Sequence, residues 1–470
     1  MSQLSFARIE YATANSATLT KKHERITSPH DDSEGHGVAI QFLPARGFAV
    51  TSGALSALAL ATFGSYPATA YDGNSWLQFG PAGDSGTSGT SSSATYDRNF
   101  IREWESNPPP GYPTLSPANI DATKQAIQRY EKIVSDGGWK QLENTELQPG
   151  TSGPLVVDLS TRLRVSGHLR EESYYPDHYG DELEKAVKRF QATNGLTPTG
   201  IVDKRTIAAL NVPAASRLKQ LKNGLSRLRE YSNSLGKKKY VVVNIPAAQI
   251  EAVENDRVVL RHTGVVGKPE RKTPILTSSI YEMNFNPVWR LPPTVIEKDL
   301  IPKGRQMQAA GKNVLVKYGI DAYDGSGRKL DPEKVKWNTS MPNGLSYSQQ
   351  PGKENPLGFL KINFNNSHSV YMHDTPSESL FGRNFRAASS GCIRVSNIEK
   401  LAAWILEDQG IGTADIASLK KSGERKDVRV KKPVPLYFVY ITAWSTEDGV
   451  VQFRRDLYQR DGVGDTATAY

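Results

Sequence analysis

The chain contains a single cysteine, Cys392, in a segment whose residue types could support thiol chemistry. Cys392 lies nineteen positions after His373, in the segment SSGCIRV. If that segment is a strand, Cys392 and Arg394 share one face, because successive side chains alternate between faces. Two nearby arginines, Arg386 and Arg394, would lower the pKa of the thiol and raise its reactivity. The pattern therefore indicates a nucleophilic cysteine; a small, buried and inert cysteine is the alternative.

His373 is the candidate base for this cysteine. Residues 369–373 (SVYMH) have the alternation of a strand, which would place Tyr371 and His373 on one face. An imidazole changes charge near neutral pH and so suits proton transfer to and from a reacting group. Asp374 follows directly but points away on the same alternation, so we expect a backbone carbonyl to orient the ring.

The rest of the composition excludes several kinds of site. One thiol cannot form an internal disulfide, a multi-thiolate zinc site or an iron–sulfur cluster within this chain. The histidines other than His373 have no metal-ligand spacing, and we assign His262 and His368 to structural roles. HExxH, CxxC and P-loop motifs are absent from the sequence. We therefore expect neither a metal nor a cofactor.

The formal net charge is +9, and the excess is spread along the 470 residues. Such a charge favours an anionic neighbour, such as a cell wall or a membrane surface. The sequence has no dense basic helix and no zinc-finger spacing, so we do not expect nucleic acid as a partner.

The elements that would position the cysteine and the histidine are strands. From Lys239 onward, short β-rich segments are separated by turn residues such as Asn255-Asp256, which indicates a sandwich or a barrel. A helix is predicted after the cysteine, with Ser396 as its N-cap and Glu399 completing a capping box. Its buried face would consist of Ile398, Leu401, Ala402 and Ile405.

Residues 300–360 interrupt the strand pattern. They are rich in Gly, Pro and Asn, with Trp337 and Tyr347 among them. A long segment of weak pattern between strands is usually functional or disordered. We interpret it as a lid, or capping subdomain, within a catalytic region that spans 239–463.

Helices are predicted ahead of the β-rich region. Residues 119–135 have apolar residues at helical spacing, and 149–212 are expected to form a compact unit of three helices. Residues 217–235 form a basic amphipathic helix, which we interpret as a solvated linker. The segments 97–148 and 213–238 would then make a helical scaffold that carries the three-helix unit.

The N-terminal region has the features of an exported protein. Residues 47–70 lack charge, follow Arg46 and end in Ala68-Thr69-Ala70, as a secretory signal does. An uncleaved membrane anchor and a buried helix are the alternatives. Signals normally begin close to the start of a chain, so we expect the polar extension 1–46 to be untranslated, with the true start later than Met1.

Two short segments complete the organisation. Residues 71–96 are rich in Gly, Ser and Thr and are expected to form a flexible linker, and 464–470 would be a tail. Export also suits a single thiol, because an oxidising compartment then offers it no second cysteine for an internal disulfide.

At this point the motifs carry a family resemblance. The phrases AVKRFQATNGL and TGIVDKRTIAAL resemble the three-helix peptidoglycan-binding domain. YMHDTP followed by SSGCIRV resembles the catalytic signature of the L,D-transpeptidases, the YkuD domain. FNPVWRLPPTVI and NPLGFLKINF agree with that resemblance. Together, residues 97–463 look like the large, periplasmic, lid-bearing class of these enzymes.

The resemblance implies a multidomain fold. It would comprise a β-rich YkuD-type catalytic domain, a β-sandwich with few helices, together with a lid subdomain. An α-helical scaffold would carry the three-helix peptidoglycan-binding-like domain. The implied location is the periplasm or cell envelope, and the implied partners are peptidoglycan stem peptides, the wall glycan and carbapenem inhibitors.

The resemblance also implies a reaction. The Cys392 thiolate attacks the diaminopimelate carbonyl of a donor tetrapeptide stem, and D-alanine leaves. The thioester is then transferred to an acceptor amine, which forms a 3→3 cross-link. His373 would act as general base and acid.

The other site residues are expected around this pair. The Gly391 backbone N–H would help to hold the oxyanion, with possible help from Tyr371. Arg394 would bind a substrate carboxylate or form a structural ion pair. Ser390 stands where many family members have a histidine and would orient the site. Trp289 is expected either in a substrate subsite or in the core.

Two other functions stay open on the sequence alone. One is a non-catalytic peptidoglycan-binding scaffold, and the other is a wall endopeptidase or carboxypeptidase that uses the same thioester. The acceptor is also open: it could be a second stem, water, a D-amino acid or an anchored protein.

Overall fold

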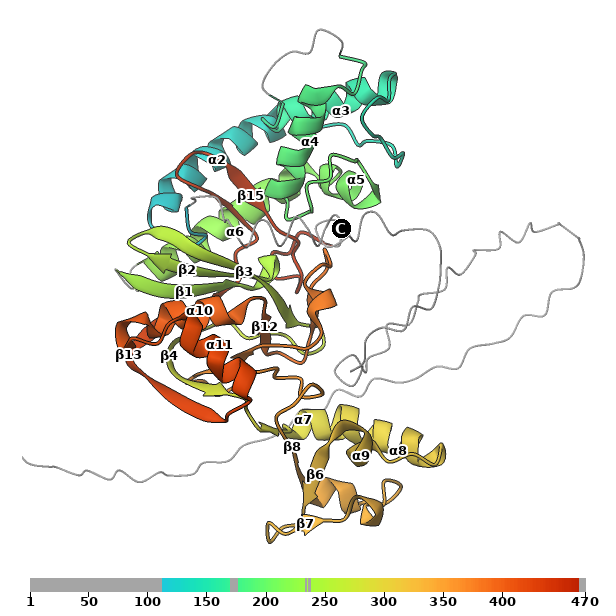
Figure 1. Ribbon diagram of the computed structural model, residues 1–470. Helices are drawn as coiled ribbons and strands as arrows, with labels where there is room; N and C mark the ends of the chain where they lie inside the picture. Colours follow the sequence, from blue (N-terminus) through green and yellow to red (C-terminus); the bar gives the residue numbers. More distant parts are fainter. Residues whose placement is uncertain (1–111, 170–175, 233–234, 236–237, 465–470) are drawn as a thin grey trace, which may run out of the picture. The chain divides into compact units, whose positions relative to one another are not determined.

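The computed structural model describes residues 112–169, 176–232, 235 and 238–464 (Figure 1). The expected extension, signal and linker at 1–96 lie outside the described residues, as does the tail beyond 464. Within the described part of the chain, no helix is both long and apolar enough to cross a membrane.

Two long helices, α2 (Ala118–Ser135) and α6 (Ala214–Ser232), pack against each other. A hairpin of β14 (Ala443–Ser445) and β15 (Val451–Phe453) completes their apolar core. Leu221 and Leu225 of α6 are buried in this packing, so the prediction of a solvated linker helix is wrong. An amphipathic pattern reveals an apolar face, but it does not reveal which distant segment covers that face.

Three helices between α2 and α6 share a core of their own: α3 (Pro154–Val165), α4 (Asp181–Thr193) and α5 (Lys204–Leu210). The Asp203 carboxylate accepts a hydrogen bond from the backbone N–H of Thr206, which caps α5 as its sequence indicates.

The β-rich region forms a nine-stranded sheet in the order β11-β3-β12-β10-β9-β4-β13-β1-β2. Its strands are β1 (Lys239–Asn244), β2 (Gln249–Glu254), β3 (Arg257–Gly267), β4 (Leu276–Phe285), β9 (Leu360–Phe364), β10 (Met372–His373), β11 (Ala387–Ser389), β12 (Ile393–Val395) and β13 (Lys426–Val439). Because β3 also pairs with β2, all of these strands except β11 close into a ring. The predicted β-rich fold with few helices is confirmed, and its strands form one continuous ring.

Two helices, α10 (Ile398–Leu406) and α11 (Thr413–Ser422), pack into the core of this region. The predicted apolar face of α10 is buried, as expected. The predicted capping box is wrong: Asn397 is the N-cap, with a φ of 45°, and it makes no side-chain cap. The Ser396 hydroxyl instead accepts a hydrogen bond from the Thr263 N–H of β3, so a tertiary contact replaces the local cap.

Between β4 and β9 the chain forms a small unit with its own core, which we call the lid (residues 289–357). Its strands run in the order β5-β8-β6-β7, with bounds Trp289–Arg290, Ser346–Gln349, Ile320–Tyr323 and Lys329–Leu330. Its helices are α7 (Pro293–Val295), the π-helix η2 (Ile296–Leu300), α8 (Ile301–Ala309) and α9 (Val314–Tyr318). Trp337 and Tyr347 stack inside it, with ring centroids 6.1 Å apart.

Candidate active site

A cavity of about 500 Å³ opens beside Cys392. One wall comes from the β-rich region and contains Tyr371, His373, Cys392 and Arg394. The opposite wall comes from the lid and contains Trp289, Pro292, Pro293, Thr294, Val295, Lys298, Pro356 and Leu357. The structure therefore brings all seven predicted site residues to one cavity, since Ser390 and Gly391 also line it.

The loop before Cys392 is fixed by its own hydrogen bonds. Gly391 has a φ of 116°, a conformation that favours glycine. The Ser389 hydroxyl donates to the Cys392 carbonyl at 2.6 Å and accepts from the Gly391 N–H at 3.1 Å. The Gly391 N–H that we predicted for the oxyanion is thus already engaged, and that role would require it to exchange this bond for one to substrate.

His373 lies at the end of β10, which pairs with β12 in parallel and with β9 in antiparallel fashion. Its Nδ1 lies 2.6 Å from the Asp374 carbonyl oxygen, so the prediction of a backbone carbonyl as the orienting group is confirmed. A carbonyl only accepts, so the bond to Asp374 favours the neutral ring with its proton on Nδ1. The Asp374 carboxylate accepts from the Phe359 N–H instead.

Burial and the neighbouring Arg394 lower the pKa of His373 to about 3. The ring is therefore neutral at pH 7 and able to take up a proton. His368, which we assigned to a structural role, lines the same cavity. The strand that ends at His373 is shorter than the predicted 369–373, because it begins at Met372, and Ser369 adopts a φ of 56°.

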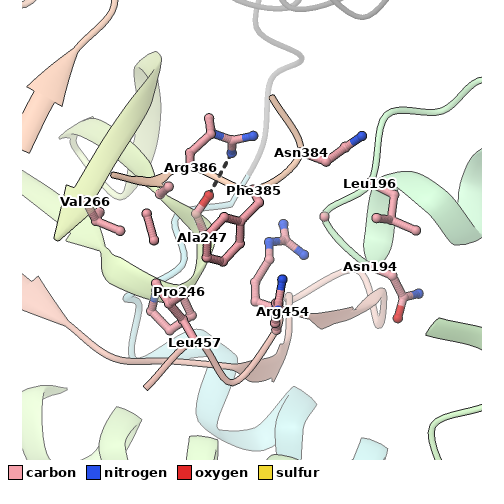
Figure 2. A pocket seen from close by; sticks show the side chains of 14 residues that line it. Asn194, Leu196, Pro246, Ala247, Val266, Asn384, Phe385, Arg386, Arg454 and Leu457 are labelled. Carbon is pink, nitrogen blue, oxygen red and sulfur yellow. Dashed lines mark hydrogen bonds between the residues drawn. The ribbon is translucent and has the colours of Figure 1, made fainter. Parts of the chain in front are cut away.

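Burial raises the pKa of the Cys392 thiol to about 11, so the expected depression by nearby arginines is wrong. Contacts from Tyr371 and the charges of Lys361 and Arg394 oppose this rise without cancelling it. Arg386 is turned away from the thiol. Figure 2 shows it in a separate small pocket, where its guanidinium donates to the Ala247 carbonyl at 2.9 Å.

Tyr371 connects the lid to the thiol. The Trp289 indole N–H donates to the Tyr371 hydroxyl at 3.1 Å, and that hydroxyl in turn interacts with the Cys392 thiol. The Tyr371 ring also lies 5.6 Å from that of His373 and 4.5 Å from the Lys361 ammonium. Trp289 is 6 % exposed, so it belongs both to the lid core and to the wall of the cavity.

Arg394 projects from β12 beside the thiol, as alternation predicted, whereas Ile393 and Val395 join the core. It is 5 % exposed, and its guanidinium lies 3.5 Å from the Thr375 hydroxyl. This position leaves both predicted roles open, the binding of a carboxylate and a structural one.

Sequence reasoning missed three contributors to the site. Lys361 faces Tyr371 from β9, Thr273 donates to the Gly391 carbonyl at 2.9 Å, and Arg271 donates to the Ser390 hydroxyl at 2.8 Å. Arg271 and Thr273 lie more than a hundred residues before the cysteine, so no local spacing could have connected them to it. Among the residues that the structure describes, no cluster of His, Cys, Asp or Glu could hold a metal ion.

Two models of known families match parts of this chain. Residues 238–434 match the model of the YkuD family, described as the L,D-transpeptidase catalytic domain. Residues 152–210, which include the three-helix unit, match the family "Putative peptidoglycan binding domain". The YkuD match includes the lid and ends within β13.

A curated relative from Haemophilus influenzae, named "Putative L,D-transpeptidase", is 30% identical over 222 residues. The match covers 47% of this chain and 44% of that protein, so this chain spans less than half the length of the relative.

Three solved L,D-transpeptidase structures are also similar. That from Xylanimonas cellulosilytica is 16% identical, with 63% of this chain and 98% of that chain covered and a TM-score of 0.21. The structure from Stackebrandtia nassauensis is 14% identical, and the match covers 62% of this chain and 94% of that chain with a TM-score of 0.26. L,D-transpeptidase 3 of Mycobacterium tuberculosis, in complex with a faropenem-derived adduct, is 11% identical. That match covers 43% of this chain and 60% of that chain, with a TM-score of 0.21.

Proposed function

We propose that this chain is a peptidoglycan L,D-transpeptidase with Cys392 as its nucleophile. The observation that carries the proposal is a thiol and a neutral imidazole on one cavity wall of a YkuD domain. The adjoining match to a peptidoglycan-binding family supports cell-wall peptidoglycan as the substrate.

The first half of the reaction forms a thioester. The Cys392 sulfur attacks the carbonyl carbon of diaminopimelate in a donor stem, and the thiol proton passes to Nε2 of His373. The raised pKa of the thiol and the lowered pKa of the imidazole both disfavour transfer of that proton before attack. The thiolate therefore forms as it attacks. The amide C–N bond then breaks, and D-alanine leaves with the proton that His373 returns.

The second half transfers the acyl group. The side-chain amine of diaminopimelate on an acceptor stem attacks the thioester, His373 takes the proton of that amine, and the Cys392 thiol leaves with it. The product is a 3→3 cross-link. Tyr371 would donate to charge that develops near the sulfur, and Arg394 would bind a carboxylate of the stem; both side chains line the cavity.

The location and partners are part of the proposal. Residues 47–70 would direct export to the periplasm, either as a cleaved signal or as a membrane anchor. The wall glycan would be bound by the three-helix domain, and carbapenems would acylate Cys392. The organisation into scaffold, binding domain and catalytic domain with its lid likewise remains our proposal.

The test compares muropeptides from cells that carry wild type or Cys392→Ala. New 3→3 dimers with wild type alone support the transpeptidase. Loss of tetrapeptides without new dimers would instead indicate hydrolysis of the thioester. No difference between the two strains would leave the non-catalytic scaffold as the function, and a carbapenem mass adduct on Cys392 would argue against that outcome.

A further inference from the structure

The loop 267–273 leaves the end of β3 and runs beside the catalytic loop. It is rigid, because the Thr273 N–H donates to the Tyr458 hydroxyl at 3.1 Å and the Gly267 N–H donates to the Thr273 hydroxyl at 2.9 Å. A Cβ on Gly267 would lie 2.2 Å from the Arg271 carbonyl oxygen, so the turn is as tight as glycine allows. This loop provides a fixed base for the Arg271 side chain.

From that base the Arg271 guanidinium reaches two different parts of the molecule. It pairs with both carboxylate oxygens of Asp299, at 2.6 and 3.1 Å. The same Nη1 atom donates to the Ser390 hydroxyl at 2.8 Å. Ser390 lies two residues before Cys392, and Asp299 belongs to the π-helix η2 of the lid. One side chain therefore joins the lid to the catalytic loop.

The contact is built as a specific link. The side chains of Arg271 and Asp299 are only 10 % and 2 % exposed. A paired arginine and carboxylate bond through a planar fork, which fixes orientation as well as distance. Removal of one partner of such a buried pair leaves an uncompensated charge, so neither side chain can be changed without effect on the other. Single-turn π-helices often occur at functional sites.

We propose that Arg271 is a positioning residue, which latches the lid through Asp299 and orients the Cys392 loop through Ser390. The proposal deepens the proposed function, since it assigns a residue that prepares the thiol for acylation. With the latch intact, the lid stays over the thiol and the catalytic loop is held in one conformation. With the latch broken, the partly exposed thiol becomes more accessible to solvent and the loop loses its orientation.

The single cysteine makes the latch measurable, because iodoacetamide labels Cys392 alone in this chain. We compare the full-length wild type with Arg271→Gln, Asp299→Asn and the double variant, in which a neutral amide pair occupies the buried site. Two rates are recorded for each: alkylation by iodoacetamide at pH 8, and acylation by imipenem, both followed by mass spectrometry.

We expect the two reaction rates of Cys392 to change in opposite directions. Each single variant raises alkylation at least tenfold and lowers acylation at least tenfold. The double variant matches the singles within about threefold, because both changes break the same link. Ser390→Ala lowers acylation but leaves alkylation within twofold of wild type, since the bond between Arg271 and Asp299 still holds the lid.

The matched control is Asp321→Asn, which breaks the lid ion pair between Asp321 and Lys329 (2.7 Å) away from the catalytic loop. Both of its rates should stay within twofold of wild type. The proposal is overturned if Arg271→Gln and Asp299→Asn alkylate like wild type, if their effects multiply in the double variant, or if Asp321→Asn behaves as they do. A simple loss of folding is detected as loss of the cooperative thermal transition.

Failure of the proposed function gives a different pattern. If wild type is not acylated by imipenem, the transpeptidase assignment loses support, while the alkylation rates still decide whether the latch exists.

Discussion

Cys392 and His373 are both held in their neutral forms by burial, which sets the terms of the chemistry. The thiol has a raised pKa of about 11 and the imidazole a lowered one of about 3. Both shifts favour the neutral thiol and the neutral imidazole at neutral pH. The groups that oppose this state from neighbouring elements are Tyr371 on the approach to β10, Lys361 on β9 and Arg394 on β12.

Tyr371→Phe tests the contribution of the tyrosine hydroxyl. The hydroxyl interacts with the Cys392 sulfur and lowers the pKa of the thiol, so its removal should raise that pKa further. Alkylation of the thiol at pH 9 should then slow about fivefold, because less thiolate is present. The rate is measured with iodoacetamide across pH 8 to 11. Tyr347→Phe is the control, since that buried hydroxyl bonds to Pro342 inside the lid; a rate for Tyr371→Phe equal to that of Tyr347→Phe would contradict the prediction.

For individual residues, the sequence predicted which side chains share a face of a strand, but it did not predict how deeply the thiol is buried. Alternation placed Cys392 and Arg394 on one face and turned Asp374 away from His373, because local geometry alone decides those points. The shift of the thiol pKa had the opposite sign to our prediction. It depends on burial in a cavity that is lined partly by lid residues such as Trp289 and Pro356, which cannot be placed by spacing.

Helix α6 shows how elements distant in sequence are joined. A Cβ on Gly224 would lie 1.8 Å from the carbonyl oxygen of Ala443, so only glycine allows α6 to approach β14 this closely. The sequence pattern of α6 predicted its apolar face but not this contact, since the partner strand lies far along the chain. The same limitation explains the false capping box at Ser396, whose hydroxyl is taken by β3.

Gly224→Ala should therefore destabilise the junction between the helical part and the C-terminal segment. We expect a loss of at least about 2 kcal/mol in the free energy of unfolding, as for other overpacked cores. Urea denaturation followed by circular dichroism measures it. Gly325→Ala provides the comparison, because a Cβ there meets nothing within 4 Å and its φ is not positive. Equal midpoints for the two variants would show that α6 can shift without cost.

Among the residues that the structure describes, three histidines are held neutral: His168 in the helical part, and His262 and His373 in the β-rich region. Burial lowers the pKa of His168 and His373 to about 3 and that of His262 to about 4. The unfolded chain binds protons at these sites below about pH 6.5, whereas the folded chain does not. Their contribution to stability is thus present above pH 6.5 and is lost as the pH falls toward 4.

The expected loss between pH 7.5 and pH 5 is about 2 kcal/mol for each histidine. Urea midpoints at the two pH values measure it. His168→Gln removes one of the three titrations and should reduce the pH dependence by about a third, since glutamine can still bond to Ser166 and Thr193. A midpoint that stays constant between pH 7.5 and pH 5 would mean that these rings are protonated in the folded protein.

The division into helical and β-rich parts could be read from periodicity. The lid was predicted at 300–360 because the pattern is interrupted there, whereas the unit with its own core spans 289–357. The sequence did not indicate that the C-terminal segment packs back against the helical part. Residues 443–461 leave the β-rich region and complete the core of α2 and α6, and the Asp461 carboxylate pairs with Arg227 of α6 at 2.7 Å. Such closure depends on tertiary contacts between residues more than two hundred positions apart.

The protonated state of the resting thiol also bears on its survival. Peroxides oxidise the thiolate and hardly react with the thiol. At a pKa of about 11, only about one molecule in ten thousand carries a thiolate at pH 7. The site thus holds its nucleophile at rest in the protonated form, which resists sulfenic acid formation.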